Sequence, residues 1–165
     1  MVTQGIYHNW DVIKIWNIMW KIKQINSLFT IVEQFNGVIY YVPNIKFSEE
    51  NVENYYSNDK RRIDIEVLVD YETDIVKAKI IVKKVLDTFP NILKAPELDI
   101  IVEKLDNSWI VLINRFWVWS KEDFFHLKSN ITETINLAFR QSWIKIPFPQ
   151  VTLSNREDFK IDLKK

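Results

Sequence analysis

The spacing of apolar residues in the second half of the chain most limits what it can fold into. The apolar residues Ile63, Ile65, Val67 and Val69 alternate with Asp64, Glu66 and, apart from Leu68, Asp70, as in a half-buried strand. Residues 75–89 carry apolar side chains at helical spacing. The segments that follow read as a strand, a turn, a strand, a helix and a short strand: 98–105, 106–107, 109–119, 120–141 and 151–153. The order β-α-β-β-α-β predicts a ferredoxin-like α/β domain.

The second predicted helix has a distinct start. Ser120 is followed three residues later by Asp123, a spacing that resembles a capping box. Its predicted buried face consists of Phe124, Leu127, Ile131, Ile135 and Ala138. We therefore expect this helix to begin at Ser120 and to pack along one apolar stripe.

The first sixty residues have a different pattern. They read as five short strands: 12–15, 22–25, 28–32, 38–42 and 52–56. Asn36-Gly37 between the third and fourth strands suits a type I′ hairpin turn. Short strands joined by tight turns predict a small β-barrel. The charged stretch 58–62 then marks a boundary between two domains.

Composition narrows the possible functions. The 22 basic and 22 acidic residues cancel, which argues against binding nucleic acid or an anionic membrane through bulk charge. The absence of cysteine excludes disulfides and thiolate catalysis. The longest stretch without a charged residue, 34–45, is shorter than the ~18 residues that span a bilayer. With no secretory signal visible, we expect a soluble chain.

Residues that often carry chemistry have structural explanations here. His8 and His126 are the only histidines, and His126 lies away from other strong ligands at metal spacing, so a surface or packing role is favoured for it. Asp64, Glu66 and Asp70 fit the solvated face of a strand better than a paired-carboxylate site. Two glycines cannot build a phosphate-binding loop. We therefore expect no enzyme, no metal and no cofactor.

Basic and aromatic clusters also have structural explanations. Lys60-Arg61-Arg62 fits a solvated hinge or a salt bridge between subunits better than a contact to phosphate or acidic lipid. Five aromatic residues lie among Ile, Val and Leu, which favours packing over base stacking: Trp109, Phe116, Trp117, Trp119 and Trp143. Small barrels and ferredoxin-like domains include nucleic-acid-binding proteins, so that alternative rests on fold analogy alone. We expect no nucleic-acid partner.

The segment that follows the last predicted helix has a restricted backbone. Pro147 and Pro149 flank Phe148, and each proline ring locks φ and removes a hydrogen-bond donor. This predicts an extended segment presented outside the domain. A strand that leaves its domain must find partners for its backbone groups elsewhere.

Three motifs resemble the small-conductance mechanosensitive channel (MscS) family. Val42-Pro43-Asn44, after the Asn-Gly hairpin, resembles its "(V/I)-P-N" element. Asn54-Tyr55-Tyr56-Ser57, followed by Arg61-Arg62, resembles its hinge, and the run from Ile146 through Gln150 resembles its "(I/F)-P-(F/Y)-P-Q" signature. The motifs lie in the family's order over residues 10–155.

The resemblance implies an α+β fold: a small Sm-like β domain, then a ferredoxin-like α/β domain, then a C-terminal strand. It implies a division into an N-terminal extension, an Sm-like domain, a ferredoxin-like domain and a strand with a tail: 1–9, 10–58, 59–149 and 150–165. The family's transmembrane helices are absent from these residues, so the chain resembles the cytoplasmic portion alone.

The resemblance also implies an assembly. In the family, seven chains form a hollow vestibule on the cytoplasmic side of the cell membrane, which filters the ions and osmolytes that reach a tension-gated pore. The expected partner is therefore the chain itself, as a homo-heptamer. Terminal strands close a parallel barrel at the base of the vestibule, which assigns oligomerisation to Pro147, Phe148, Pro149, Gln150, Val151 and Leu153.

Tryptophan replaces glycine at three positions of the family pattern. Trp10, Trp16 and Trp20 stand where the family usually has glycine, and tryptophan resists the positive φ that a hairpin glycine adopts. We infer that the sequence is engineered. The three rings have three possible roles that the residues do not separate: a membrane-interface belt, an apolar subunit contact, or filling of space left by missing pore helices.

Overall fold

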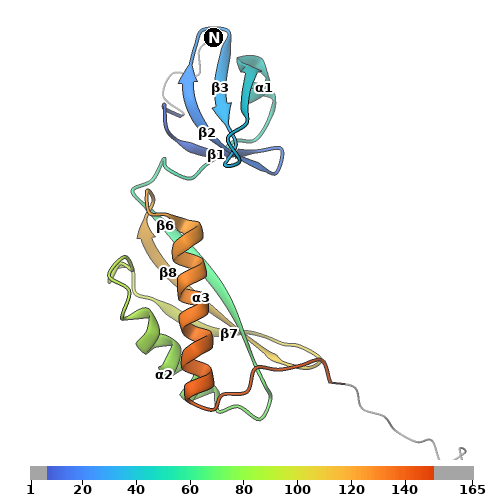
Figure 1. Cartoon of the computed structure of the whole chain (residues 1–165), viewed down its shortest axis with the longest axis vertical. Helices are drawn as coiled ribbons and strands as arrows, with labels where there is room; N and C mark the ends of the chain where they lie inside the picture. Colours follow the sequence, from blue (N-terminus) through green and yellow to red (C-terminus); the bar gives the residue numbers. More distant parts are fainter. Residues whose placement is uncertain (1–6, 151–165) are drawn as a thin grey trace, which may run out of the picture.

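The computed structural model describes residues 7–150, which form two β-sheet domains in succession along an elongated molecule (Figure 1). The first domain contains β1 (Val12–Ile15), β2 (Ile18–Ile25), β3 (Phe29–Glu33), β4 (Ile39–Pro43), α1 (Asn44–Glu49) and β5 (Glu53–Asn54). The second contains β6 (Lys60–Val69), α2 (Ile75–Leu86), β7 (Asp99–Leu105), β8 (Ile110–Trp119) and α3 (Phe124–Gln141). The predicted α+β class is confirmed.

The five strands of the first domain form one antiparallel sheet in the order β4-β3-β2-β1-β5. Trp16 and Asn17 form the two-residue loop between β1 and β2, with φ of 53° and 60°. Positive φ at both positions is what a type I′ hairpin requires. This sheet therefore has its two-residue turn at a tryptophan.

The type I′ turn predicted at Asn36-Gly37 is wrong. Only Gly37 has positive φ, at 86°, and its N–H donates to the Gln34 carbonyl at 2.9 Å. Gln34 N–H in turn donates to the Val38 carbonyl at 2.9 Å. The loop therefore has three residues, in the arrangement that ends on a left-handed glycine.

Trp20 belongs to the core of the first domain. Its side chain is 3% exposed, its ring meets Tyr40 edge-on at 4.8 Å, and its indole N–H donates to the Ile15 carbonyl at 3.4 Å. The remaining buried members of this core are Tyr7, Ile13, Ile15, Ile22, Val32, Val42 and Phe47. A membrane or subunit contact for Trp20 is therefore wrong, because the ring is already enclosed.

The second sheet has the order β6-β8-β7, with both outer strands antiparallel to β8. Strands β6 and β7 are thus parallel to each other and are connected through α2, with β8 between them. This is the arrangement of the first three strands of a ferredoxin-like domain. The predicted last strand, 151–153, lies outside the described residues.

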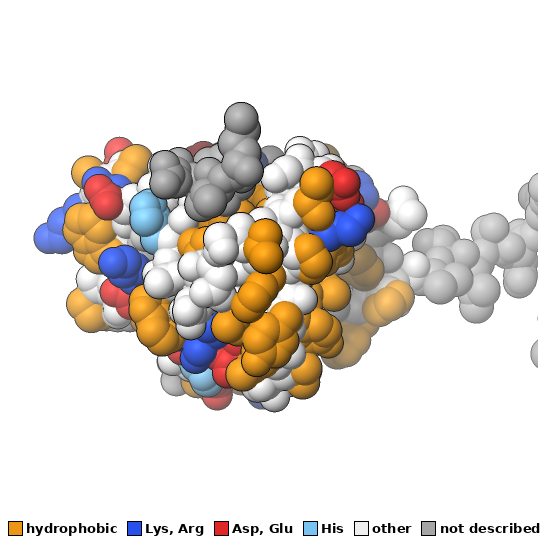
Figure 2. Space-filling model, turned by 90° about the horizontal axis from the view of Figure 1, so that it is seen from above, with side chains coloured by type: hydrophobic (Ala, Val, Ile, Leu, Met, Phe, Trp, Pro, Cys, Tyr) orange, Lys and Arg blue, Asp and Glu red, His pale blue; other side chains and the backbone are white. Residues whose placement is uncertain are grey.

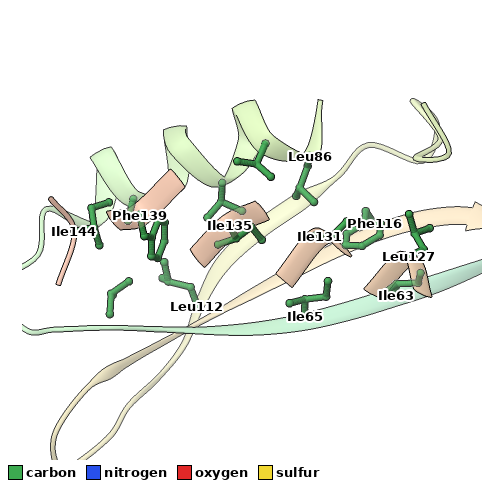
Figure 3. Close-up of a cluster of buried hydrophobic side chains, with 14 of the residues drawn as sticks. Ile63, Ile65, Leu86, Leu112, Phe116, Leu127, Ile131, Ile135, Phe139 and Ile144 are labelled. Atoms are coloured by element: carbon green, nitrogen blue, oxygen red, sulfur yellow. The ribbon is translucent and has the colours of Figure 1, made fainter. Parts of the chain in front are cut away.

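Helices α2 and α3 cover one face of this sheet and enclose the larger core (Figure 3). The alternating residues of β6 predicted to be buried are Ile63, Ile65 and Val69, each at most 2% exposed, with Val67 partly buried. The buried stripe of α3 is Leu127, Ile131, Ile135 and Phe139. Leu127, Ile131 and Ile135 of the predicted stripe are confirmed, whereas Phe124 and Ala138 are only partly buried and Phe139 is the fourth buried member.

The predicted helix start at Ser120 is wrong by three residues. Asp123 is the N-cap of α3, and its carboxylate accepts a hydrogen bond from the His126 N–H at 3.2 Å. Ser120 instead extends the pairing between β6 and β8, since its N–H donates to the Asp59 carbonyl at 2.8 Å. Because the strand pairing continues through Ser120, α3 starts at the later capping residue, Asp123.

The C-terminal end of α3 carries a tryptophan in a glycine-like conformation. Trp143 has φ of 60°, and hydrogen bonds run from Trp143 N–H to Arg140 O and from Ile144 N–H to Phe139 O. These two bonds define a Schellman motif with Trp143 at the position that glycine usually occupies. Its side chain is 92% exposed, so no packing compensates for the left-handed backbone.

Candidate assembly surface

Strand β4 presents apolar side chains on both faces of an unpaired sheet edge. The strand order leaves β4 and β5 as the two edges of the first sheet among the described residues. Ile39, Tyr40 and Tyr41 of β4 are 49%, 41% and 69% exposed. A sheet edge with free backbone groups and apolar side chains favours pairing with another chain.

Exposed apolar side chains also surround Tyr41 of β4: Leu28, Phe29 and Ile45. Leu28 is 79% exposed and Ile45 is 65% exposed, and the rings of Phe29 and Tyr41 lie 6.0 Å apart. Seen from the end of the molecule that the first domain forms, many hydrophobic side chains cluster toward the centre and lower right of the face, while others are scattered among polar ones (Figure 2). Such a clustered patch marks an interaction surface more often than scattered apolar residues do.

The Val42-Pro43-Asn44 motif holds this surface together. Val42 is buried in the core, and Pro43 precedes the first residue of α1. The Asn44 amide donates to the Asn26 and Ser27 carbonyls at 2.8 and 3.1 Å, and its oxygen accepts from the Thr30 hydroxyl at 2.8 Å. Asn44 thereby ties the β2–β3 turn to the end of β4, which gives this motif a structural role.

Sequence reasoning missed β4 as a candidate site and placed oligomerisation at the C-terminal exit. A signal was present, because four successive residues of β4, Ile39 to Val42, are apolar or aromatic. A strand with one solvated face alternates apolar and polar residues instead. Unbroken apolar character on an edge strand indicates that a partner covers the second face.

The C-terminal exit is exposed and held at its far end. Phe148 is 79% exposed and Pro147 is half-buried. The Gln150 backbone N–H donates to the Ser108 hydroxyl at 3.1 Å. Pro149 is exposed. Val151 and Leu153, the other residues predicted to oligomerise, lie outside the described residues, so their role stays a prediction.

The neighbouring arginines of the hinge motif have different environments. Arg62 forms a bidentate pair with Asp64, at 2.7 and 3.0 Å, and hydrogen bonding to that carboxylate raises the pKa of Arg62. Arg61 instead stacks between the rings of Tyr55 and Phe124. Only Arg62 therefore forms the salt bridge expected of this motif, and it does so within the chain.

Trp10 and Trp16 are the exposed members of the three tryptophans that stand where the family resemblance predicts glycine, at 57% and 44%. Trp10 has φ of 76°, so both tryptophans adopt the backbone conformation that favours glycine. The ammonium groups of Lys21 and Lys23 lie 5.4 and 5.1 Å from the Trp10 ring. This places an aromatic ring beside two cations on the surface.

Residues 7–150 contain no helix with both the length and the apolar composition needed to cross a bilayer. The same residues bring together no group of three histidine or acidic side chains suited to a metal ion.

The structure thus consists of a β domain followed by an α/β domain, with an apolar sheet edge left open among the described residues. Residues 1–57 match the model of the mechanosensitive ion channel beta-domain, and residues 63–146 match that of the MscS C-terminal domain. The chain belongs to the MscS family of mechanosensitive ion channels, and it contains the family's β and C-terminal domains.

Relatives and solved structures agree with this assignment. An uncharacterized MscS family protein of Synechocystis is 32% identical over 87% of this chain and 49% of its own length. The small-conductance mechanosensitive channel of Helicobacter pylori is 26% identical over 87% of this chain and 53% of its own length. The chain thus spans about half the length of these relatives.

The closed-state crystal structure of Helicobacter pylori MscS superposes with a TM-score of 0.85 at 24% identity, over 93% of this chain and 61% of that one. Arabidopsis thaliana MSL1 gives 0.69 at 14% identity, over 86% of this chain and 51% of its own. At these identities the likeness concerns the fold.

Proposed function

We propose that this chain forms the cytoplasmic vestibule of a mechanosensitive channel, a ring of identical subunits that filters the ions and osmolytes reaching the pore. The observation that carries this proposal is the open β4 edge, with Ile39 and Tyr41 exposed on a strand that is apolar on both faces. Family membership makes another copy of the chain the natural partner. In the full channel, this ring lies on the cytoplasmic side of the membrane.

The two sheet edges favour a ring over a two-fold dimer. Strand β4 has five residues and β5 has two, so the edges differ in length and in side chains. Joining one edge to the different edge of the next subunit is a heterologous contact, which closes into a ring when the rotation permits. Seven subunits is the number that the family resemblance implies, with Pro147-Phe148-Pro149 directing each chain toward a common base.

Native mass spectrometry of the purified chain is expected to show a closed homo-oligomer, with seven copies as the main species. The physical reason is that a heterologous contact joins two different edges. Both edges of every subunit are paired only when each subunit has two neighbours, as in a closed ring. A monomer at micromolar concentration would refute the ring. A closed ring of another number would preserve self-association and refute the heptamer.

A second candidate function rests on Trp10, which lies within 5.4 Å of two lysine ammonium groups. Tryptophan beside lysine is typical of proteins that touch the interface of an anionic membrane. In this proposal, an engineered chain uses Trp10 and Trp16, but not the buried Trp20, to hold the ring against lipid. Flotation with anionic liposomes is then expected, and Trp10→Gly with Trp16→Gly is expected to abolish it. Flotation that persists in this double variant would refute the role of the rings.

A further inference from the structure

Arg61 lies at the junction of the two domains and is enclosed by aromatic rings. Its guanidinium carbon is 4.8 Å from the centre of the Tyr55 ring and 4.2 Å from that of Phe124. Tyr55 follows β5 of the first domain, and Phe124 opens α3 of the second. The two domains also meet at Phe35 and Phe125, whose rings contact edge to face at 5.7 Å.

A cavity of about 370 Å³ opens beside Arg61 at this junction. Phe35 and Tyr56 line it from the first domain, while Lys121, Phe125 and His126 line it from the second. A concave site with aromatic walls and a small number of polar groups is the usual form of a small-molecule site.

The charge of Arg61 is not compensated. Its guanidinium makes no hydrogen bond or ion pair with any residue between 7 and 150, and it lies over the rings of Tyr55 and Phe124. Burial lowers the pKa of Arg61, which reflects the cost of removing this cation from water. Burial and the hydrogen bond to Glu53 raise the pKa of Tyr55, so its phenol is neutral at pH 7 and supplies no negative charge.

Two carboxylates also line the cavity, and each accepts a hydrogen bond from a neutral group, which orients it and leaves its charge in place. Glu122 accepts a hydrogen bond from the Asn91 amide at 2.8 Å. Asp123 caps α3 through the His126 N–H at 3.2 Å. The neighbouring Arg62, by contrast, has both of its hydrogen bonds to Asp64. Arg61 and Lys121 are therefore the cations lining this cavity that lack an acceptor among residues 7–150, and of the two Arg61 lies between the aromatic rings.

We propose that the junction cavity binds a small oxyanion, a phosphate or a carboxylate, through the edge of the Arg61 guanidinium. Stacking on Tyr55 and Phe124 occupies the faces of the guanidinium and leaves its N–H groups, which lie in the plane, available. That fork matches two oxygens of a carboxylate or phosphate. Lys121 and His126 supply further donors from the loop before α3 and from its first turn.

The test is a titration of the ¹⁵N-labelled full chain with sodium phosphate and, separately, with sodium glutamate, at constant ionic strength set by chloride. We expect saturable shifts of the Arg61 side-chain Nε–H and of the amides of residues 121–126. The two titrations show whether phosphate or carboxylate is preferred. The site does not depend on ring formation, so the result is independent of the proposed vestibule function.

Arg61→Gln is expected to weaken binding at least about tenfold, because charge-assisted bonds to the anion are lost. Arg62→Gln is the matched control and is expected to bind as the unmodified chain does, because Arg62 is paired with Asp64. Arg61→Lys keeps the charge without the planar fork and is expected to bind several-fold more weakly. The proposal is overturned by the absence of saturation with both anions, by equal weakening in both glutamine variants, or by unchanged affinity in Arg61→Lys.

Discussion

A chain carrying Ile39→Asp together with Tyr41→Asp is expected to remain monomeric under conditions in which the unmodified chain forms a ring. Both side chains lie on β4 and are largely exposed in the single chain, at 49% and 69%, so the change costs the monomer little packing. In a ring, each carboxylate would be buried without a partner at every interface, at a cost of several kcal/mol per ion. Because one closed ring repeats the contact, the loss is cooperative.

Size-exclusion chromatography with light scattering measures this outcome directly. A matched control is Val76→Asp with Ile80→Asp on α2, where the side chains are 67% and 51% exposed but belong to the second domain. This control is expected to keep the mass of the unmodified assembly. A ring that survives the β4 changes would show that the interface lies elsewhere. Loss of the ring in both variants would point to general solubility effects rather than to β4.

Trp143→Gly is expected to raise the free energy of unfolding of the second domain by about 1 kcal/mol. The left-handed backbone costs an L-residue about 1–2 kcal/mol, and glycine removes this cost. Part of the stabilisation is offset because glycine loses more conformational entropy on folding. No packing is lost, since the Trp143 side chain is 92% exposed. Trp16→Gly and Trp10→Gly are expected to change stability in the same direction by less, because those rings are partly covered.

Trp20→Gly is the opposite case and serves as the control. Its ring is 3% exposed in the core, so we expect a loss of at least about 3–5 kcal/mol, the usual cost of deleting a buried aromatic side chain. Urea denaturation followed by far-UV circular dichroism compares all four variants without relying on tryptophan fluorescence. Destabilisation by Trp143→Gly would show that the exposed ring makes a contact that outweighs its backbone strain.

Local periodicity explains why much of the fold was predictable. Alternation along residues 63–69 and the stripe from Leu127 to Ile135 reflect strand and helix geometry, which acts over a few residues. Boundaries were less predictable. Ser120 and Asp123 both have capping chemistry, and the choice between them depends on the hydrogen bond from Ser120 to Asp59, sixty-one positions away in the chain.

The candidate site was less predictable than the fold. The apolar run of β4 was visible, but its exposure depends on the order of strands in the sheet, which places β4 at an edge. Arg61 and Arg62 are adjacent in the sequence, yet one stacks between two domains while the other pairs with Asp64. Successive residues of a strand point to opposite faces, so neighbours meet different surroundings.

The sequence by itself determined the order of a β domain and an α/β domain and the family, because periodicity and motif spacing are properties of the chain. Only the tertiary structure decided that Trp20 is a core residue whereas Trp10 and Trp16 are exposed in strained turns. The pairing of β1 with β2 and the packing of Tyr40 make that distinction. Burial depends on contacts between segments that are distant in the chain, and no local pattern specifies them.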